Sequence, residues 1–203
     1  MRAAEAEVSD EVLMLRYQRG DKDAFGALVR RYQVRVYNFV LRQLRSEATA
    51  EDVAQEVFLR LVQRASAFKH EARFSTWLYT IARNLCVDQL RKSNLRRHPS
   101  LDHGQGQDPD GPTLGEQLAD PRSDVERRAN SSQVASSILN AVHQLSEEQR
   151  EVFLLREVAN LPFKEIAEVT GTSENTVKSR MRYALEHLQG KLSDFEEYAR
   201  ALR

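Results

Sequence analysis

The side chains best suited to chemistry lie along one side of a helical pattern near the carboxyl end of the chain. From residue 174 to 188, apolar residues at helical spacing define the side to be buried, namely Val177, Met181, Ala184, Leu185 and Leu188. The opposite side carries amide, hydroxyl and cationic groups, namely Asn175, Lys178, Ser179, Arg182 and Tyr183. Groups of these kinds hydrogen-bond to base edges and phosphates, so this side predicts DNA binding in the major groove.

The segment directly before this face supports the same interpretation. Pro162 suits the first turn of a short helix, whose apolar residues then share one face. Gly171 supplies a backbone that can make a tight turn, and Ser173 or Thr172 can cap the next helix. The stretch from Leu161 to Leu192 therefore predicts a DNA-binding helix-turn-helix. The alternative is a pair of packed helices whose outer face is only solvated.

A second candidate is the basic stretch from Arg73 to Arg97. It holds six cations and one carboxylate, Asp88, so it creates a local positive field although the formal net charge of the chain is zero. Aromatic and amide side chains in the same stretch could stack on unpaired bases or hydrogen-bond to them. Trp77 and Leu78 are better explained as core residues. The candidates for binding a single strand are Lys69, Arg73, Arg83 and Asn84.

No catalytic or metal-binding set accompanies these two patches in the sequence. The five histidines are scattered, the single cysteine leaves no zinc-binding spacing, and glycine-rich phosphate-binding motifs are missing. The carboxylates mostly fall at helix-surface positions. Cys86 lies in an apolar helical pattern, so we interpret it as a small core residue in a reducing compartment. The sequence thus predicts a protein that is not an enzyme and uses no cofactor or metal ion.

The elements that must position these residues are helices. Charged residues are abundant, glycine and proline are scarce and β-branched runs are rare, so the 203 residues predict an all-α protein. No apolar segment follows the first residues and no run of about 18 apolar residues occurs, which predicts a cytoplasmic protein without a membrane span. The balanced charge also excludes a polycation that coats nucleic acid, so any DNA contact must come from local patches.

Four helices with short connections predict an amino-terminal domain from residue 1 to 97. Apolar residues recur at helical spacing over 9–19 and 23–44, and again from Trp77 to Leu90. Between these, Thr49 can cap a third helix whose first turn carries carboxylates. On that third helix the polar side chains fall on the side opposite the apolar ones. This polar side must therefore contact either a partner or water.

A polar segment separates this domain from a second one. Residues 98–123 contain four of the five prolines and half of the eight glycines, with almost no apolar residues, which predicts a flexible linker. A second helical domain covers 124–203. Within it, Ser146 and Gln149 fit a capping box that opens an apolar helix, and the helix-turn-helix follows.

Four motifs, in order, resemble the extracytoplasmic-function sigma factors of bacterial RNA polymerase. They are GDKDAFGALVRRY (20–32), AEDVAQEVFLRL (50–61), FKHEARFSTWLYTIARNLCVDQLR (68–91) and LSEEQREVFLLREVANLPFKEIAEVTGTSENTVKSRMRYALEHL (145–188). Their order around a polar linker makes the resemblance specific over nearly the full length. It implies a four-helix domain like sigma region 2 and a helix-turn-helix domain like sigma region 4, and it implies a factor that directs core polymerase to promoters and helps melt them.

The resemblance also implies roles for residues of the first domain. Asp52, Gln55 and Glu56 correspond to the surface that docks on the clamp helices of the largest polymerase subunit. The run from Lys69 to Arg73 corresponds to the loop that captures a base flipped from the −10 element, and Asn84 corresponds to a position facing the −10 strand. Together with basic neighbours, the predicted −10-binding residues are Lys69, His70, Arg73, Arg83, Asn84 and Arg91.

In the second domain the resemblance implies contacts with the −35 element. Arg156 matches a contact with the DNA backbone. The residues that match positions inserted in the major groove are Asn175, Thr176, Lys178, Ser179, Arg182 and Tyr183. Tyr183 departs from the family, which often has arginine at this position.

The implied partners are core RNA polymerase, through its clamp helices and flap, and promoter DNA, with no small-molecule substrate. The resemblance alone adds an anti-sigma factor, which is often membrane-anchored in this family. The main alternative is a stand-alone helix-turn-helix regulator that binds an operator as a dimer without polymerase. That alternative leaves the basic stretch and the polar linker without a role. A nucleic-acid-modifying enzyme is a more distant alternative, and the missing catalytic set disfavours it.

Overall fold

The computed structural model describes residues 8–69, 71–97 and 137–201, and within them helices are the only regular secondary structure. The predicted all-α class is therefore confirmed. The predicted linker at 98–123 lies outside the described residues, so the domain boundaries stay predictions. No helix among the described residues is both long enough and apolar enough to span a lipid bilayer.

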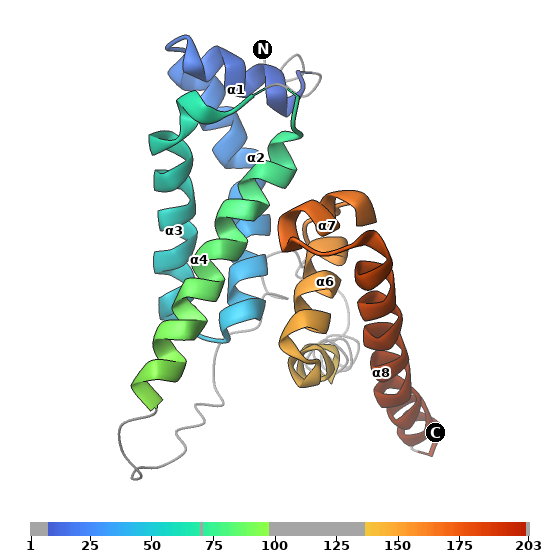
Figure 1. The fold of residues 1–203 in the computed structure, drawn as a ribbon. Helices are drawn as coiled ribbons and strands as arrows, with labels where there is room; N and C mark the ends of the chain where they lie inside the picture. Colours follow the sequence, from blue (N-terminus) through green and yellow to red (C-terminus); the bar gives the residue numbers. More distant parts are fainter. Residues whose placement is uncertain (1–7, 70, 98–136, 202–203) are drawn as a thin grey trace, which may run out of the picture.

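The first helical unit contains α1 (Asp10–Gln18), α2 (Lys22–Leu44), α3 (Glu47–Gln63), a short 3-10 helix η2 (Ala65–Ala67) and α4 (Phe74–Arg97). α2, α3 and α4 pack along one another, and α1 lies across one end of them (Figure 1). The core between them is rich in aromatic rings. Phe39 and Tyr79 meet edge to face with centroids 5.5 Å apart, and both are fully buried.

The start of α3 corrects one prediction. Thr49 was expected to cap this helix, but the cap is Ser46, whose Oγ accepts a 3.4 Å hydrogen bond from the Thr49 N–H. The reason lies in the preceding turn. Arg45 adopts a left-handed conformation with φ of 60° and ends α2, after which Ser46 is extended and ready to cap. Thr49 consequently lies inside the helix.

The second helical unit contains a helical segment described over 137–144, then α6 (Glu147–Glu157), α7 (Phe163–Thr170) and α8 (Glu174–Ala201). The predicted capping box is present at α6, because Ser146 and Gln149 exchange both of its hydrogen bonds. Gly171 has φ of 68° and ends α7, as the predicted helix-turn-helix requires. Pro162 precedes the first residue of α7 as its N-cap.

One apolar residue of this unit is more exposed than predicted. Leu185 is 49% exposed although it was expected on the buried stripe of α8. Leu185 follows the fully buried Ala184, and one residue along a helix turns the side chain by about 100°. The packed stripe of α8 is therefore narrower than the sequence indicated.

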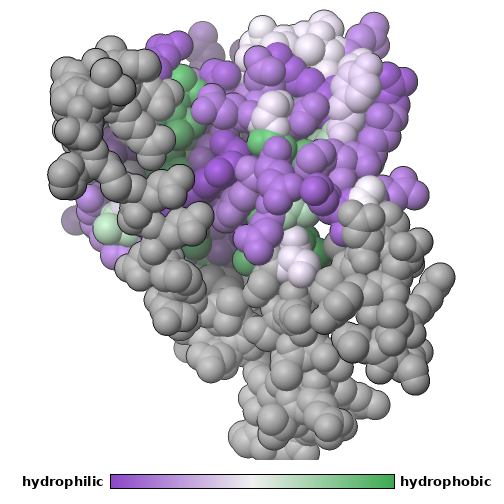
Figure 2. All heavy atoms as spheres, turned by 90° about the horizontal axis from the view of Figure 1, so that it is seen from below, coloured by the Kyte–Doolittle hydropathy of each residue, from purple (hydrophilic) through white to green (hydrophobic). Residues whose placement is uncertain are grey.

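The two units pack against each other. α7 lies against α4 and α6 lies against α2, while α8 packs on α6 and α7 away from the first unit (Figure 1). Hydrophilic residues dominate the described surface in Figure 2, where hydrophobic residues show only in small areas between them. The apolar side chains of both units are thus largely used within the fold.

Candidate nucleic-acid interface

The helix-turn-helix presents a polar face on α8. Ser173 caps this helix, since its Oγ accepts a 3.1 Å hydrogen bond from the Thr176 N–H. Val177, Met181 and Ala184 are buried against the rest of the unit. The five residues predicted to point outward from α8 are all exposed, namely Asn175, Lys178, Ser179, Arg182 and Tyr183, whereas Thr176 is half-buried.

The cations of this face make only weak internal contacts. Lys178 Nζ lies 2.6 Å from Glu174 Oε1, and Arg182 Nε lies 3.7 Å from Glu186 Oε1, with all four side chains well exposed. The Arg182 guanidinium also lies over the Tyr183 ring, 4.9 Å from its centroid. Exposed ion pairs contribute little to stability, so both cations could exchange their carboxylates for DNA phosphates.

Arg156, which is predicted to contact DNA, also makes contacts within the fold. Its Nη1 donates a 3.0 Å hydrogen bond to the Leu161 carbonyl, and its guanidinium lies 5.1 Å from the centroid of the Phe163 ring. These contacts brace the connection between α6 and α7. A guanidinium has five N–H donors, so others remain for a phosphate at the half-exposed side chain.

On the first unit, some of the predicted −10-binding residues face solvent and two others pair with carboxylates of the second unit. Lys69, Asn84 and Arg91 are exposed, whereas His70 lies outside the described residues. Arg73 and Arg83 instead meet carboxylates of the second unit. Arg73 Nε lies 3.2 Å from Glu165 Oε1, and Arg83 Nε donates a 2.8 Å hydrogen bond to Glu151 Oε1. The described arrangement therefore engages Arg83, whose side chain is 26% exposed, whereas Arg73, 74% exposed, could still exchange its carboxylate for a phosphate.

The interpretation of Trp77 and Leu78 as core residues agrees with the structure. Leu78 is fully buried, and the half-buried Trp77 packs against Phe68 with ring centroids 5.2 Å apart. Cys86 is likewise buried, and burial raises the pKa of its thiol to about 12. The thiol is thus held protonated in the core and is unsuited to act as a nucleophile.

Sequence reasoning missed the carboxylates at the contact between units. Glu151 is 6% exposed and Glu165 is 8% exposed, although carboxylates were expected on helix surfaces. A signal was present in the sequence. Glu151 precedes the buried Leu154 and Leu155 by three and four residues, and Glu165 precedes the buried Val169 by four. Charged residues at core spacing predict a buried partner.

The predicted polymerase-binding residues lie on the outer side of α3. Asp52 and Gln55 are exposed, while Glu56 is half-buried and pairs with Arg60 at 2.7 Å. Next to them on α3, the apolar Leu59 and Val62 are 56% and 40% exposed. Exposed apolar residues beside a polar row suit a protein partner better than water alone.

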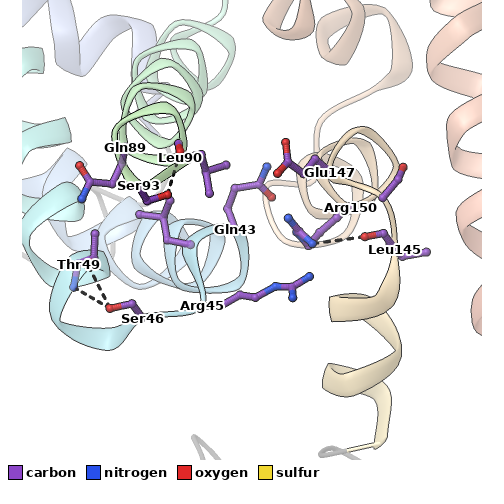
Figure 3. Close-up of a pocket in the computed structure, with 12 residues that line it drawn as sticks. Gln43, Arg45, Ser46, Thr49, Gln89, Leu90, Ser93, Leu145, Glu147 and Arg150 are labelled. Carbon is purple, nitrogen blue, oxygen red and sulfur yellow. Dashed lines mark hydrogen bonds between the residues drawn. The ribbon is translucent and has the colours of Figure 1, made fainter. Parts of the chain in front are cut away.

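A groove opens between the first unit, near the carboxyl end of α2, and the second unit, near the start of α6. Figure 3 shows side chains of both units facing each other across it. The cavity measures about 620 Å³, and its lining includes Gln43 and Arg45 from the first unit and Arg150 from the second. Arg45 donates a hydrogen bond to the His143 carbonyl across the contact. Two buried polar atoms here, Gln43 Oε1 and Arg150 Nε, have no hydrogen-bond partner among the described residues.

Three guanidinium groups act on His143, which lies beside this groove. Burial lowers the pKa of His143, and the nearby guanidinium groups of Arg45, Arg150 and Arg42 lower it further. Burial likewise lowers the pKa of Arg150. Within the residues that the structure describes, no cluster of three histidine, cysteine or carboxylate side chains could hold a metal ion.

Comparison with known proteins adds two family matches. Residues 28–96 match the family described as Sigma-70 region 2, and residues 135–188 match the family described as Sigma-70, region 4. The first match contains α3 and nearly all of α4. The second contains α6, α7 and the polar face of α8.

Curated relatives cover most of the chain. It is 33% identical over 186 residues to the ECF RNA polymerase sigma-E factor of Haemophilus influenzae, which is 92% of this chain and 96% of the relative. It is 32% identical over 177 residues to the ECF RNA polymerase sigma factor SigW of Bacillus subtilis, with coverage of 87% and 93%. The sigma factor BldN of Streptomyces coelicolor is 34% identical over 187 residues, but the match spans 65% of that relative.

Solved structures share the fold at lower identity. The complex of CnrH with the cytosolic domain of CnrY aligns with a TM-score of 0.66 at 22% identity, covering 92% of this chain and 99% of the other. The sigma factor RpoE of Bartonella quintana, co-crystallised with the anti-sigma factor NepR, aligns with a TM-score of 0.63 at 19% identity, covering 83% and 96%. Both have the same arrangement of helices.

Proposed function

Because this chain belongs to the extracytoplasmic-function sigma factors, which direct RNA polymerase to promoters, we propose that its two helical units divide promoter recognition between them. The second unit reads the −35 element as duplex, and the first unit holds the −10 element as separated strand. The observation that carries this proposal is the placement of two basic, hydrogen-bonding faces, on α8 and α4, in different units.

The face of α8 suits a duplex. A helix fits the major groove, where lysine and arginine read guanine and asparagine reads adenine. Lys178, Arg182 and Asn175 supply these groups from exposed positions. Tyr183 is 50% exposed, and it would bring a ring edge and a hydroxyl to a position where the family resemblance implies a cation. Arg156 would anchor the phosphate backbone beside them.

The α4 stretch suits an unpaired strand. Opening a promoter requires that flipped bases be held, at a cost of a few kcal/mol per base that pocket and backbone contacts must offset. Arg83, Asn84 and Arg91 lie on α4, with Lys69 and Arg73 just before it. Together with His70 they form the proposed −10-binding set.

We assign polymerase binding to the outer side of α3. Asp52, Gln55 and Glu56 would dock on the clamp helices of the largest subunit, and the second unit would meet the flap. Holding both units on one large partner raises the effective concentration of the second DNA contact once the first has formed. A sigma factor needs no catalytic set or cofactor of its own for this task, because the polymerase performs the chemistry.

An anti-sigma factor is the proposed restraining partner. The similar RpoE of Bartonella quintana is co-crystallised with the anti-sigma factor NepR. Such a partner, in many cases anchored in the membrane, would cover the polymerase-binding surface until a signal releases it.

The test of the proposed function is transcription from a promoter library by purified core polymerase with and without this chain. We expect a set of start sites that appears only with the chain and shares two sequence elements upstream. A stand-alone regulator would instead bind an operator duplex tightly by itself and leave the start sites of core polymerase unchanged.

A further inference from the structure

We propose that the groove between the carboxyl end of α2 and the start of α6 binds a phosphate monoester of a sugar or nucleoside. None of its lining residues belongs to the sets proposed above for DNA or polymerase. The groove measures about 620 Å³, a volume within the range of small-molecule sites. Binding there can be measured without DNA or polymerase, so the inference stands apart from the proposed function.

Two guanidinium groups line the groove, one from each unit. Arg45 belongs to the turn that ends α2 and is exposed, whereas Arg150 belongs to α6 and is 4% exposed. Figure 3 shows both side chains extending toward the space between the two units. A guanidinium can bind a phosphate through two parallel hydrogen bonds, so this pair suits a phosphate ester.

Two helices also begin at this groove. Ser46 is the N-cap of α3 and Ser146 is the N-cap of α6, and both residues line the groove. The backbone N–H groups and the dipole of a helix N-terminus favour an anion. The two guanidinium groups and the two helix ends therefore add positive potential at one place.

Carboxylates near the groove offset this potential only in part. Glu147 lines the groove, and Glu47 and Glu148 lie in the first turns of α3 and α6, but all three are exposed. Water and salt screen an exposed charge strongly, whereas a buried charge acts through a medium of lower dielectric constant. The buried Arg150 therefore outweighs these carboxylates at the wall of the groove.

Two buried polar atoms indicate what the ligand must offer. Arg150 Nε is a donor without an acceptor, and Gln43 Oε1 is an acceptor without a donor, among the described residues. Both side chains are 4% exposed and line the groove. A buried polar atom without a partner is costly, and rotation about the outer side-chain bonds would bring each atom to a ligand. A phosphate oxygen would satisfy Arg150, and a sugar hydroxyl or a base N–H would satisfy Gln43.

The rest of the lining suits the uncharged part of such a ligand. Gln89 and Ser93 bring an amide and a hydroxyl from α4, which can hydrogen-bond to a sugar. Leu44, Leu90 and Leu145 offer apolar surface to sugar carbons or to a base ring. Inorganic phosphate would leave this wall uncovered. The lining therefore favours an ester over the free ion.

The experiment is isothermal titration calorimetry of the full chain with inorganic phosphate, ribose 5-phosphate, AMP and adenosine. We expect at least one of the two esters to bind at a single site, about tenfold more tightly than inorganic phosphate and adenosine, because only the esters join both required groups. Equal binding of ribose 5-phosphate and AMP would identify a sugar phosphate, and tighter binding of AMP would identify a nucleotide. The inference is overturned if neither ester shows saturable binding, or if inorganic phosphate or adenosine binds as tightly.

Substitutions of the arginines locate the site. Arg45→Gln and Arg150→Gln should each lower the affinity for the tighter ester about tenfold, because each removes a charged donor. The control is Arg64→Gln, which removes the same charge from an exposed position at the opposite end of α3 and should change the affinity by about twofold at most. Because Arg45 is exposed, its variant keeps the test decisive if the Arg150 variant does not fold. Unchanged affinity in Arg45→Gln would contradict the site.

Gln43→Leu separates a binding role from a structural one. Leucine removes the unpartnered oxygen, so the free protein should unfold at a higher temperature than wild type. The same change removes the acceptor offered to the ligand, so affinity for the ester should fall about fivefold or more. Thermal unfolding and calorimetry measure the two effects on the same sample. A more stable variant that binds the ester as tightly as wild type would contradict the assignment of this groove.

Discussion

Thr76 Oγ1 and Glu165 Oε2 lie 2.6 Å apart in a buried hydrogen bond that joins the two helical units. The two residues are 89 positions apart in the chain, and each belongs to a segment with a proposed role in DNA binding. Their contact couples the position of α7, in the helix-turn-helix, to that of α4 in the first unit.

Replacing this hydroxyl tests the contact. Thr76→Val keeps the shape of the side chain but leaves one oxygen of the buried Glu165 without its donor, which should cost about 1–3 kcal/mol of docking between the units. The radius of gyration in solution should rise. Thr76→Ser, which retains a hydroxyl, should stay near the wild-type value. Equal compactness of the Val and Ser variants would show that this hydrogen bond does not hold the units together.

The polar face of α8 predicts a defined effect on duplex binding. Lys178→Ala and Arg182→Ala should each weaken binding of the holoenzyme to the −35 element, by about 1–3 kcal/mol where the residue contacts a base. Lys191→Ala, an exposed lysine further along the same helix, is the control. Binding assays on several −35 sequences provide the measurement. A loss that is equal on every sequence would reassign that residue to the phosphate backbone.

The outer side of α3 predicts a loss of polymerase binding. Gln55→Ala combined with Glu56→Arg should weaken the complex with core polymerase, because it removes an exposed polar group and reverses a charge on the proposed docking surface. Affinity pull-down and thermal unfolding are measured together, so that loss of binding is separated from unfolding. Glu157→Arg, exposed on α6, should leave core binding intact. If the α3 variant is retained as well as wild type, this surface is not the docking site.

The buried thiol predicts slow alkylation. Burial raises the pKa of Cys86 to about 12, so at pH 8 nearly all of the thiol is protonated, and the thiolate is the reactive form. Iodoacetamide should therefore label the native protein far more slowly than the same protein in denaturant, as mass spectrometry would show. Rapid labelling of native protein would place Cys86 outside the core.

Local signals allowed much of the fold to be predicted. The capping box at Ser146, the turn at Gly171 and the cap at Ser173 each depend on residues within one turn of the helix they serve. The exposed side of α8 followed from helical periodicity alone. The misplaced cap at Thr49 was also a local error, because the left-handed Arg45 that moves the start of α3 to Ser46 has no sequence signature.

The contacts between the two helical units could not be predicted from local sequence signals. Glu151 and Glu165 resemble ordinary surface carboxylates until Arg83 and Thr76 are brought to them from 68 and 89 residues away. Only their spacing from buried leucines and valines indicated a buried position. The candidate DNA-binding residues could be named from sequence, but which of them pair with carboxylates of the other helical unit depends on this tertiary packing.

The most direct test of the whole account is a run-off transcription assay with core polymerase, this chain and one promoter taken from the library selection. The account predicts a transcript of defined length that requires the chain and is lost when either the −10 or the −35 element is scrambled. A core polymerase that binds the chain yet yields no chain-dependent transcript, or one indifferent to both elements, would contradict it.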